Sequence, residues 1–465
     1  MKPTFNANLT RRNFLVGGCQ VFLGSCFGFQ ALARPVDKDP HFCLHLFFPG
    51  GMDATYTFDA RPLAMTQAKL QTNYHGKEPV KVVGSNGTNT WRTTLVDPLK
   101  PYLNRFSIIN GVIMTPDFQG HEDSQSITFT GNPFGGPSYF EAFQTLLDEP
   151  PITAMRLGVP MVGDPRIQTS GVLPLDRNST KNMVMRSKDI TTLNANTRIQ
   201  NFIKGRLQPQ QHDIGSYGRT KQLLSEAFGK IPALSSTMQD IKIDDSDKPQ
   251  TPVESVKLAL NLFKAGLSNN ALCVFDTDLS ENQDLDCHDL SGAKDHPRIV
   301  GELMTELAAI FNVLETTAYD NQRSYFDVTT VIVSTEFGRT MRQGYFDESG
   351  TDHNPYTNTF LLGGKGIKGG LVLGESDFAS VEEKSKLSGA HLQLDPIAYN
   401  VVGRPFDFAT FEPRTDKPNE FKLGDYLTCG SVINTVLACF NVDTKHWRTP
   451  VRNTPPFLAL RPLLT

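Results

Sequence analysis

The sequence HFCLHLFF, residues 41–48, runs directly into PGGMD, residues 49–53. An apolar run of this length that stops at proline and glycine is typical of a strand buried on both faces and followed by a tight turn. We expect this strand to share one sheet with four similar apolar runs, at residues 105–112, 271–275, 328–334 and 359–362.

Amphipathic segments lie between these runs, at residues 254–267 and 297–314. In the second, apolar residues from Ile299 to Leu314 recur at spacings of three and four, and we expect Pro297 to be the first residue of that helix. Strands that alternate with helices predict an α/β fold, a three-layer α/β/α sandwich with a largely parallel central sheet. Such sheets bind ligands at the carboxyl ends of their strands.

The amino terminus has the features of an export signal. TRRNFL, residues 10–15, overlaps an uncharged run over residues 13–33 that ends in Ala31-Leu32-Ala33. This pattern predicts a twin-arginine signal peptide over residues 1–33, recognised by the twin-arginine translocase, and a periplasmic or secreted protein. An uncleaved membrane anchor, and lipidation at Cys26 within LGSC, are the alternatives.

We expect residues 34–465 to form a single domain with a helical or mobile insertion around 205–253. Three of the 45 basic residues lie in 1–33, which leaves 42 against 49 acidic residues and argues against a nucleic-acid partner. Five cysteines remain outside 1–33. Because the number is odd, we expect at least one free thiol.

Carboxylates and imidazoles gather where the predicted strands end. Parallel strands end at one edge of a sheet, so side chains that follow them come together, and these residue types bind divalent metal ions. The sequence therefore predicts a site for zinc, calcium or manganese with the candidate ligands Asp53, Asp286, His288, Glu336 and His353.

Two further residues are candidates for catalysis. His121 follows the strand that ends at residue 112, and we expect it to act as acid or base. Arg339 follows Glu336 closely, and its guanidinium suits a phosphate or sulfate group.

Structural roles compete with these assignments. Asp53 after two glycines suits a side-chain-capped turn, and Glu336 with Arg339 suits an ion pair. Asp295 and His296 suit the cap of the helix expected from residue 297. Cys287 is the only cysteine in a predicted site loop, so a thiol enzyme is a third functional alternative.

Several landmarks occur in an order that resembles the domain-of-unknown-function family 1501, exported bacterial proteins placed in the alkaline phosphatase and sulfatase superfamily. The resemblance extends over residues 41 to 375 and implies a sheet flanked by helices with a site at the strand ends. The landmarks are PGGMD at 49–53, residues 120–131, DCH at 286–288, HPR at 296–298, STEFGRT at 334–340 and GTDH at 350–353.

In the superfamily, aspartates and histidines at such positions hold two metal ions, and Asp53, Asp286, His288 and His353 match them. The chain departs from the pattern at Glu336-Phe337, where the superfamily places Asp-His. It departs again at the position of the nucleophile, where Gly120-His121 offers no hydroxyl.

The leading hypothesis is an exported metal-binding, hydrolase-like protein that acts on a phosphate or sulfate ester of a small molecule or polysaccharide. The alternative is a non-catalytic binding or assembly protein of the cell envelope on a degenerate hydrolase fold. The two departures favour the alternative.

Overall fold

The computed structural model describes residues 39–64, 77–114, 120–131, 138–143, 154–158, 172–174, 251–264, 266, 268–275, 285–288, 290–340, 351–378, 401–415, 423–442 and 457–465. The expected signal peptide and the expected insertion around 205–253 lie outside the described residues. Within the described residues, no helix is both long and apolar enough to cross a membrane.

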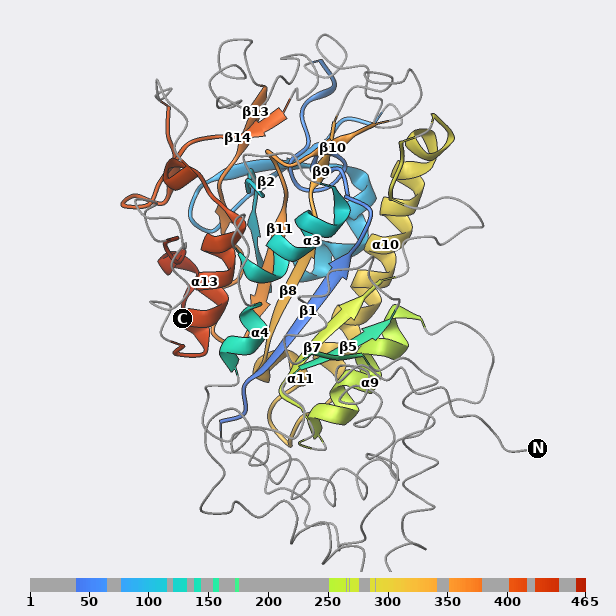
Figure 1. Cartoon of the computed structure of the whole chain (residues 1–465), viewed down its shortest axis with the longest axis vertical. Helices are drawn as coiled ribbons and strands as arrows, with labels where there is room; N and C mark the ends of the chain where they lie inside the picture. The colour runs from blue at the N-terminus through green and yellow to red at the C-terminus, as the bar shows by residue number, and fades with distance from the viewer. Residues whose placement is uncertain are drawn as a thin grey trace, which may run out of the picture.

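An eight-stranded sheet forms the centre of the structure (Figure 1). All its strands run in the same direction except β11, which is antiparallel to both of its neighbours. In spatial order the strands are β12 (Val372–Leu373), β4 (Phe106–Ile109), β11 (Phe360–Gly364), β8 (Thr329–Thr335), β1 (Phe42–Phe48), β7 (Asn270–Val274), β5 (Ala154–Gly158) and β6 (Val172–Pro174).

Helices cover both faces of the sheet (Figure 1). One face packs against α9 (Pro252–Lys264), α10 (Leu290–Thr316) and α11 (Tyr325–Val328). The other packs against α3 (His121–Thr130), α4 (Tyr139–Ala142) and α13 (Cys429–Cys439). The three-layer α/β/α sandwich with a largely parallel central sheet is therefore confirmed.

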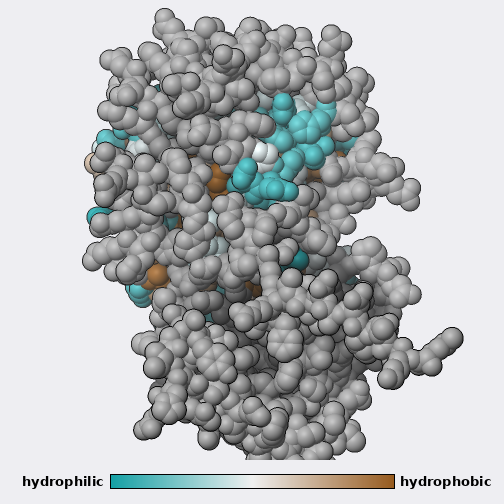
Figure 2. Space-filling view, viewed as in Figure 1, coloured by the Kyte–Doolittle hydropathy of each residue, from teal (hydrophilic) through white to brown (hydrophobic). Residues whose placement is uncertain are grey.

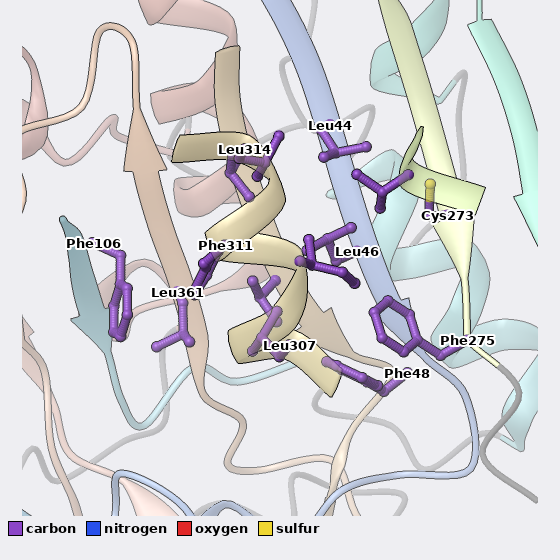
Figure 3. Packing of buried hydrophobic residues seen from close by; sticks show 14 of the residues in the cluster. Leu44, Leu46, Phe48, Phe106, Cys273, Phe275, Leu307, Phe311, Leu314 and Leu361 are labelled. Carbon is purple, nitrogen blue, oxygen red and sulfur yellow. The ribbon is translucent and has the colours of Figure 1, made fainter. Parts of the chain in front are cut away.

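The alternation of side chains along β1 explains why this strand is central. Leu44, Leu46 and Phe48 contribute to the core beneath α10, where Phe311 of the helix also lies (Figure 3). Cys43 and Phe47 contribute to the core on the opposite face. Every residue of β1 is buried, as the uninterrupted apolar run predicts.

The expected strands and helices are confirmed, with two differences. The helix expected from Pro297 begins at Leu290, so Pro297 lies inside α10 and the cap assigned to Asp295 and His296 is wrong. The strand at residues 359–362 is present but antiparallel. Periodicity reports which face of an element is buried and carries little information on where a helix begins or which way a strand runs.

Short elements lie beyond the main sheet. The antiparallel pair of β9 (Gly338–Arg339) and β10 (His353–Asn354) follows the carboxyl end of β8. The other pairs and 3₁₀ helices are β2 (Val80–Val83) with β3 (Asn89–Arg92), β13 (Ser376–Phe378) with β14 (Val401–Gly403), β15 (Phe406–Asp407) with β16 (Glu412–Pro413), η1 (Ala54–Tyr56), η2 (Thr94–Tyr102), η5 (Leu423–Asp425) and η7 (Arg461–Leu463).

A buried polar network in the core is centred on His45 of β1. Its Nδ1 lies 2.8 Å from the hydroxyl of Tyr139, and its Nε2 lies 2.7 Å from Oγ of Ser334. Both ring nitrogens are thus satisfied although the residue is fully buried. Burial disfavours the charged imidazole and lowers the pKa of His45 to about 3.

We predict that this histidine makes the protein acid-sensitive. Its pKa is lower in the folded than in the unfolded state, so the unfolded chain binds the proton first as the pH falls. Below about pH 6.5 the free energy of unfolding therefore decreases, by up to about 1.4 kcal/mol per pH unit. His45→Gln should flatten this dependence, measured as the difference between free energies of urea unfolding at pH 7 and pH 5. Equal differences in wild type and variant would contradict the prediction.

Candidate metal centre

Three segments that follow different strands bring four side chains together beyond the carboxyl ends of the sheet. His121 is the first residue of α3, Asp286 and His288 lie between β7 and α10, and His353 lies in β10. One nitrogen from each histidine and one oxygen from Asp286 all lie within 4.8 Å of one another. This group could hold a metal ion.

The spacing of these atoms matches the ligands of a small cation. His288 Nε2 lies 3.1 Å from Asp286 Oδ1 and 2.9 Å from His353 Nε2, and His353 Nε2 lies 3.9 Å from Asp286 Oδ1. His121 Nε2 lies 3.3 Å from Asp286 Oδ2. Bonds of about 2.1 Å place tetrahedral ligand atoms roughly 3.4 Å apart, so a zinc-sized ion fits the residues present.

Glu336 lies behind His121, on the side away from the other three residues of the group. Its Oε1 accepts a 2.6 Å hydrogen bond from the backbone N–H of Gly50 and lies 2.6 Å from Nδ1 of His121. The side chain is 0% exposed, immediately after β8. Glu336 therefore contacts a member of the group but does not belong to it.

The guanidinium of Arg339, in β9, donates hydrogen bonds to oxygen atoms of the protein itself. Its Nη2 contacts the carbonyl of Gly50 and lies 2.6 Å from Asp286 Oδ1, while its Nε lies 3.2 Å from the carbonyl of Gly51. The residue is 1% exposed. In this arrangement the guanidinium fixes Asp286 and the glycine turn and does not present a fork to an anion.

Phe337 lies between the histidines and the glycine turn. Its ring centroid is 4.2 Å from that of His353 and 5.1 Å from that of His121. Gly51 has a φ of +82°, and a Cβ there would overlap the Phe337 ring. The turn after β1 therefore needs glycine both for its backbone conformation and for the space that this ring occupies.

Asp53 has the turn-capping role. Its Oδ1 accepts hydrogen bonds of 2.8 Å from the backbone N–H and 2.6 Å from the hydroxyl of Thr55, at the start of η1. Its backbone N–H donates to Nε2 of His296. Asp53 does not belong to the four-residue group.

Cys287 faces the interior. Its Sγ lies 3.4 Å from Nδ1 of His296 and 2.9 Å from Oγ1 of Thr351. The side chain is buried, and burial raises the pKa of its thiol. A buried thiol with a raised pKa is a poor nucleophile, so the structure gives no support to the thiol-enzyme alternative.

The histidines of the group differ in protonation. Burial lowers the pKa of His121, but its hydrogen bonds to Asp286 and Glu336 outweigh burial and raise the pKa to about 9. The hydrogen bond to Asp286 raises the pKa of His288, and burial lowers the pKa of His353. Burial alone would raise the pKa of Asp286, yet its three histidine partners hold it well below its usual range.

The group is open to solvent on one side. The side chain of Asp286 is 34% exposed and that of His288 is 44% exposed. Figure 2 shows hydrophilic side chains gathered on this face, over the region where Figure 1 places the start of α3 and the β9–β10 pair.

Residues 286–393 match the family model described as "Protein of unknown function (DUF1501)". The matched region contains Asp286, His288 and His353 of the group, together with Glu336 and Arg339.

The chain is also similar to solved structures at low identity. The lipoteichoic acid synthase LtaP from Listeria monocytogenes has a TM-score of 0.37 and 8% identity, over 84% of this chain and 83% of that one. The sulfatase PsFucS1 from Pseudoalteromonas sp. gives 0.32 and 10%, over 90% and 80%. An alkaline phosphatase superfamily protein from Vibrio parahaemolyticus gives 0.32 and 9%, over 96% and 99%. No curated protein sequence matches the chain.

The structure brings some of the side chains predicted from the sequence together at this edge of the sheet and keeps others apart. Asp286, His288 and His353 come together as candidate ligands, and His121, expected as an acid or base, joins them. Asp53, Glu336 and Arg339 have the contacts described above. The roles of Phe337 and of the Gly50 backbone had no sequence signal, because both depend on contacts between distant segments.

We predict that zinc binding to this protein releases protons. His121 and His288 bind protons more tightly than free histidine, and a cation beside them must displace these protons. The affinity should therefore rise by about tenfold per pH unit for each proton released between pH 6 and 8. Calorimetry in buffers of different ionisation enthalpy measures the release, and a pH-independent affinity would contradict the prediction.

Proposed function

We propose that the protein binds one divalent transition-metal ion, through Asp286, His288 and His353, and acts as a metal-dependent hydrolase. The spacing of the ligand atoms carries this proposal, because the three distances of 2.9, 3.1 and 3.9 Å bracket the edge expected for one small ion. One ring nitrogen of His121 lies within 4.8 Å of the ligand atoms of these three residues.

The donor set favours some metals over others. Calcium takes six to eight oxygen ligands and manganese also prefers oxygen, whereas imidazole nitrogens with one carboxylate suit zinc or iron. The residues of the group provide nitrogen from three histidines and oxygen from Asp286. Of the metals expected from the sequence, zinc therefore fits better than manganese or calcium.

A bound ion would be the positive charge that an anionic substrate meets at the group. Three carboxylates lie at the group, those of Asp286, Glu336 and Asp352, and the guanidinium of Arg339 contacts Asp286. A divalent ion there would bring the sum of these charges to about zero. When bound, such an ion supplies Lewis-acid polarisation of an ester oxygen and activates water. His121 faces the same point and is placed to hold or deliver a proton.

We propose phosphate or sulfate esters as the substrate class, because a bound divalent ion would attract their anionic oxygens. A small-molecule ester and a polysaccharide ester carry the same group, so this attraction does not distinguish between them. The openness of the group on the side of His288 is compatible with either.

A non-catalytic binding protein is the second candidate, and the burial of Arg339 favours it. The guanidinium expected to clamp an anion is 1% exposed and bonds to backbone carbonyls. If His121 is a fourth ligand, the ion has four protein ligands, as in structural zinc sites, and no position is left for a substrate.

His121 and His288 variants separate the two candidates. We expect zinc-loaded wild type to hydrolyse 4-nitrophenyl phosphate or 4-nitrophenyl sulfate, and His288→Ala to lose both metal and turnover. His121→Ala should keep the metal, measured by elemental analysis, and lose about 100-fold in turnover, in the range typical of a general acid or base. His41→Ala, at the opposite end of β1, is the matched control.

Loss of the metal in His121→Ala, with no turnover in wild type, would instead establish the closed, non-catalytic site. Wild type that contains no metal above background, and gains no thermal stability from added zinc or manganese, would overturn both candidates.

We further propose export through the twin-arginine translocase to the periplasm or beyond, on the pattern of residues 10–33. Arg11→Lys with Arg12→Lys should keep the protein in the cytoplasmic fraction of a bacterial host, detected by cell fractionation and immunoblot. Lys2→Gln leaves the arginine pair intact and should be exported normally. Export of the double variant at the wild-type level would argue against this route.

A further inference from the structure

We infer that Glu336 is a positioning residue, which holds the imidazole of His121 with Nδ1 protonated and turns Nε2 toward Asp286, His288 and His353. This inference rests on the proposed metal site and assigns a role to the position where the chain departs from the superfamily pattern. Glu336 acts through His121 and is not itself a ligand of the ion.

The hydrogen-bond directions fix the tautomer. The backbone N–H of Gly50 can only donate, so Glu336 Oε1 accepts from it at 2.6 Å. The same oxygen, which already accepts that hydrogen bond, lies 2.6 Å from Nδ1 of His121, so we assign Nδ1 as the donor that carries a proton. In the neutral ring, Nε2 then bears the lone pair that faces the group.

The burial of Glu336 makes this arrangement rigid. The side chain is 0% exposed, and its position is set by β8, which ends one residue earlier. Its Oε2 is buried and has no hydrogen-bond partner among the described residues. Among these residues the carboxylate is therefore held through Oε1, by Gly50 and His121. Carboxylates that hold metal-binding histidines in this way tune the basicity and orientation of the ring.

The neighbouring residue supports the same role. The ring of Phe337 is inclined at 32° to that of His353, at a centroid distance of 4.2 Å, and also contacts His121. Glu336 thus orients one imidazole by a hydrogen bond, while Phe337 packs against two. An Asp-His pair at this position would supply metal ligands. Glu336 and Phe337 instead contact the histidines of the group and hold their rings in place.

The first test observes the hydrogen bond directly and needs no metal. A short hydrogen bond from Nδ1 to a carboxylate moves the proton resonance far downfield, so the wild type should show such a signal in the metal-free protein. The signal should be absent in Glu336→Gln and in His121→Asn. It should remain in Asp59→Asn, because Asp59 is an equally buried carboxylate that pairs with Arg61.

The second test asks whether Glu336 acts only through His121. Glu336→Gln should lower the turnover of the zinc-loaded protein by about 10- to 100-fold, because the His121 ring then loses its orientation. In the His121→Asn background the same substitution should have no further effect, since the pair acts as a unit. Asp59→Asn should leave the turnover unchanged, and melting temperatures compare the stability of all variants.

Additive losses in the double variant would overturn the inference, because Glu336 would then contact the ion or act through the fold. A downfield signal that survives Glu336→Gln would overturn it as well. Failure of the proposed function has a different signature: wild type that binds no zinc but shows the downfield signal retains the Glu336–His121 pair.

Discussion

The buried guanidinium of Arg339 joins the parts of the candidate site. It bonds to the carbonyls of Gly50 and Gly51 and to Asp286, so it ties the turn after β1 to the segment after β7. The neighbouring N–H of Gly50 bonds to Glu336 after β8. Because a buried charge that loses its partner typically costs about 3–5 kcal/mol, these contacts strongly favour one arrangement of the three segments.

The same contacts create the electrostatic state of the group. Arg339 occupies one oxygen of Asp286 and neutralises part of its charge, while His121 lies against the other oxygen and against Glu336. Without a cation, protons on His121 and His288 supply the missing positive charge, which is why the pKa values of both rings are raised. A cation bound between these side chains would have to displace the protons.

Much of the fold follows from local patterns. The apolar run of β1 is buried along its whole length, and the expected strands and long helices are present because each must bury an apolar face. The direction of β11 and the first residue of α10 were not predictable in this way. The direction of β11 depends on its pairing with β4 and β8, and Pro297 is tolerated inside α10, where packing against the sheet outweighs its local preference.

The sequence by itself determined where the polar side chains gather, because strands that run in one direction deliver the residues after them to one edge of the sheet. Only the tertiary structure decided which of these residues face one another. Asp53 bonds to Thr55 in its own turn, whereas Glu336 bonds to His121, 215 residues away. A contact between residues so far apart in the sequence depends on how α3 and the β9–β10 pair pack against the end of the sheet. No local pattern in the sequence determines how close these two elements lie.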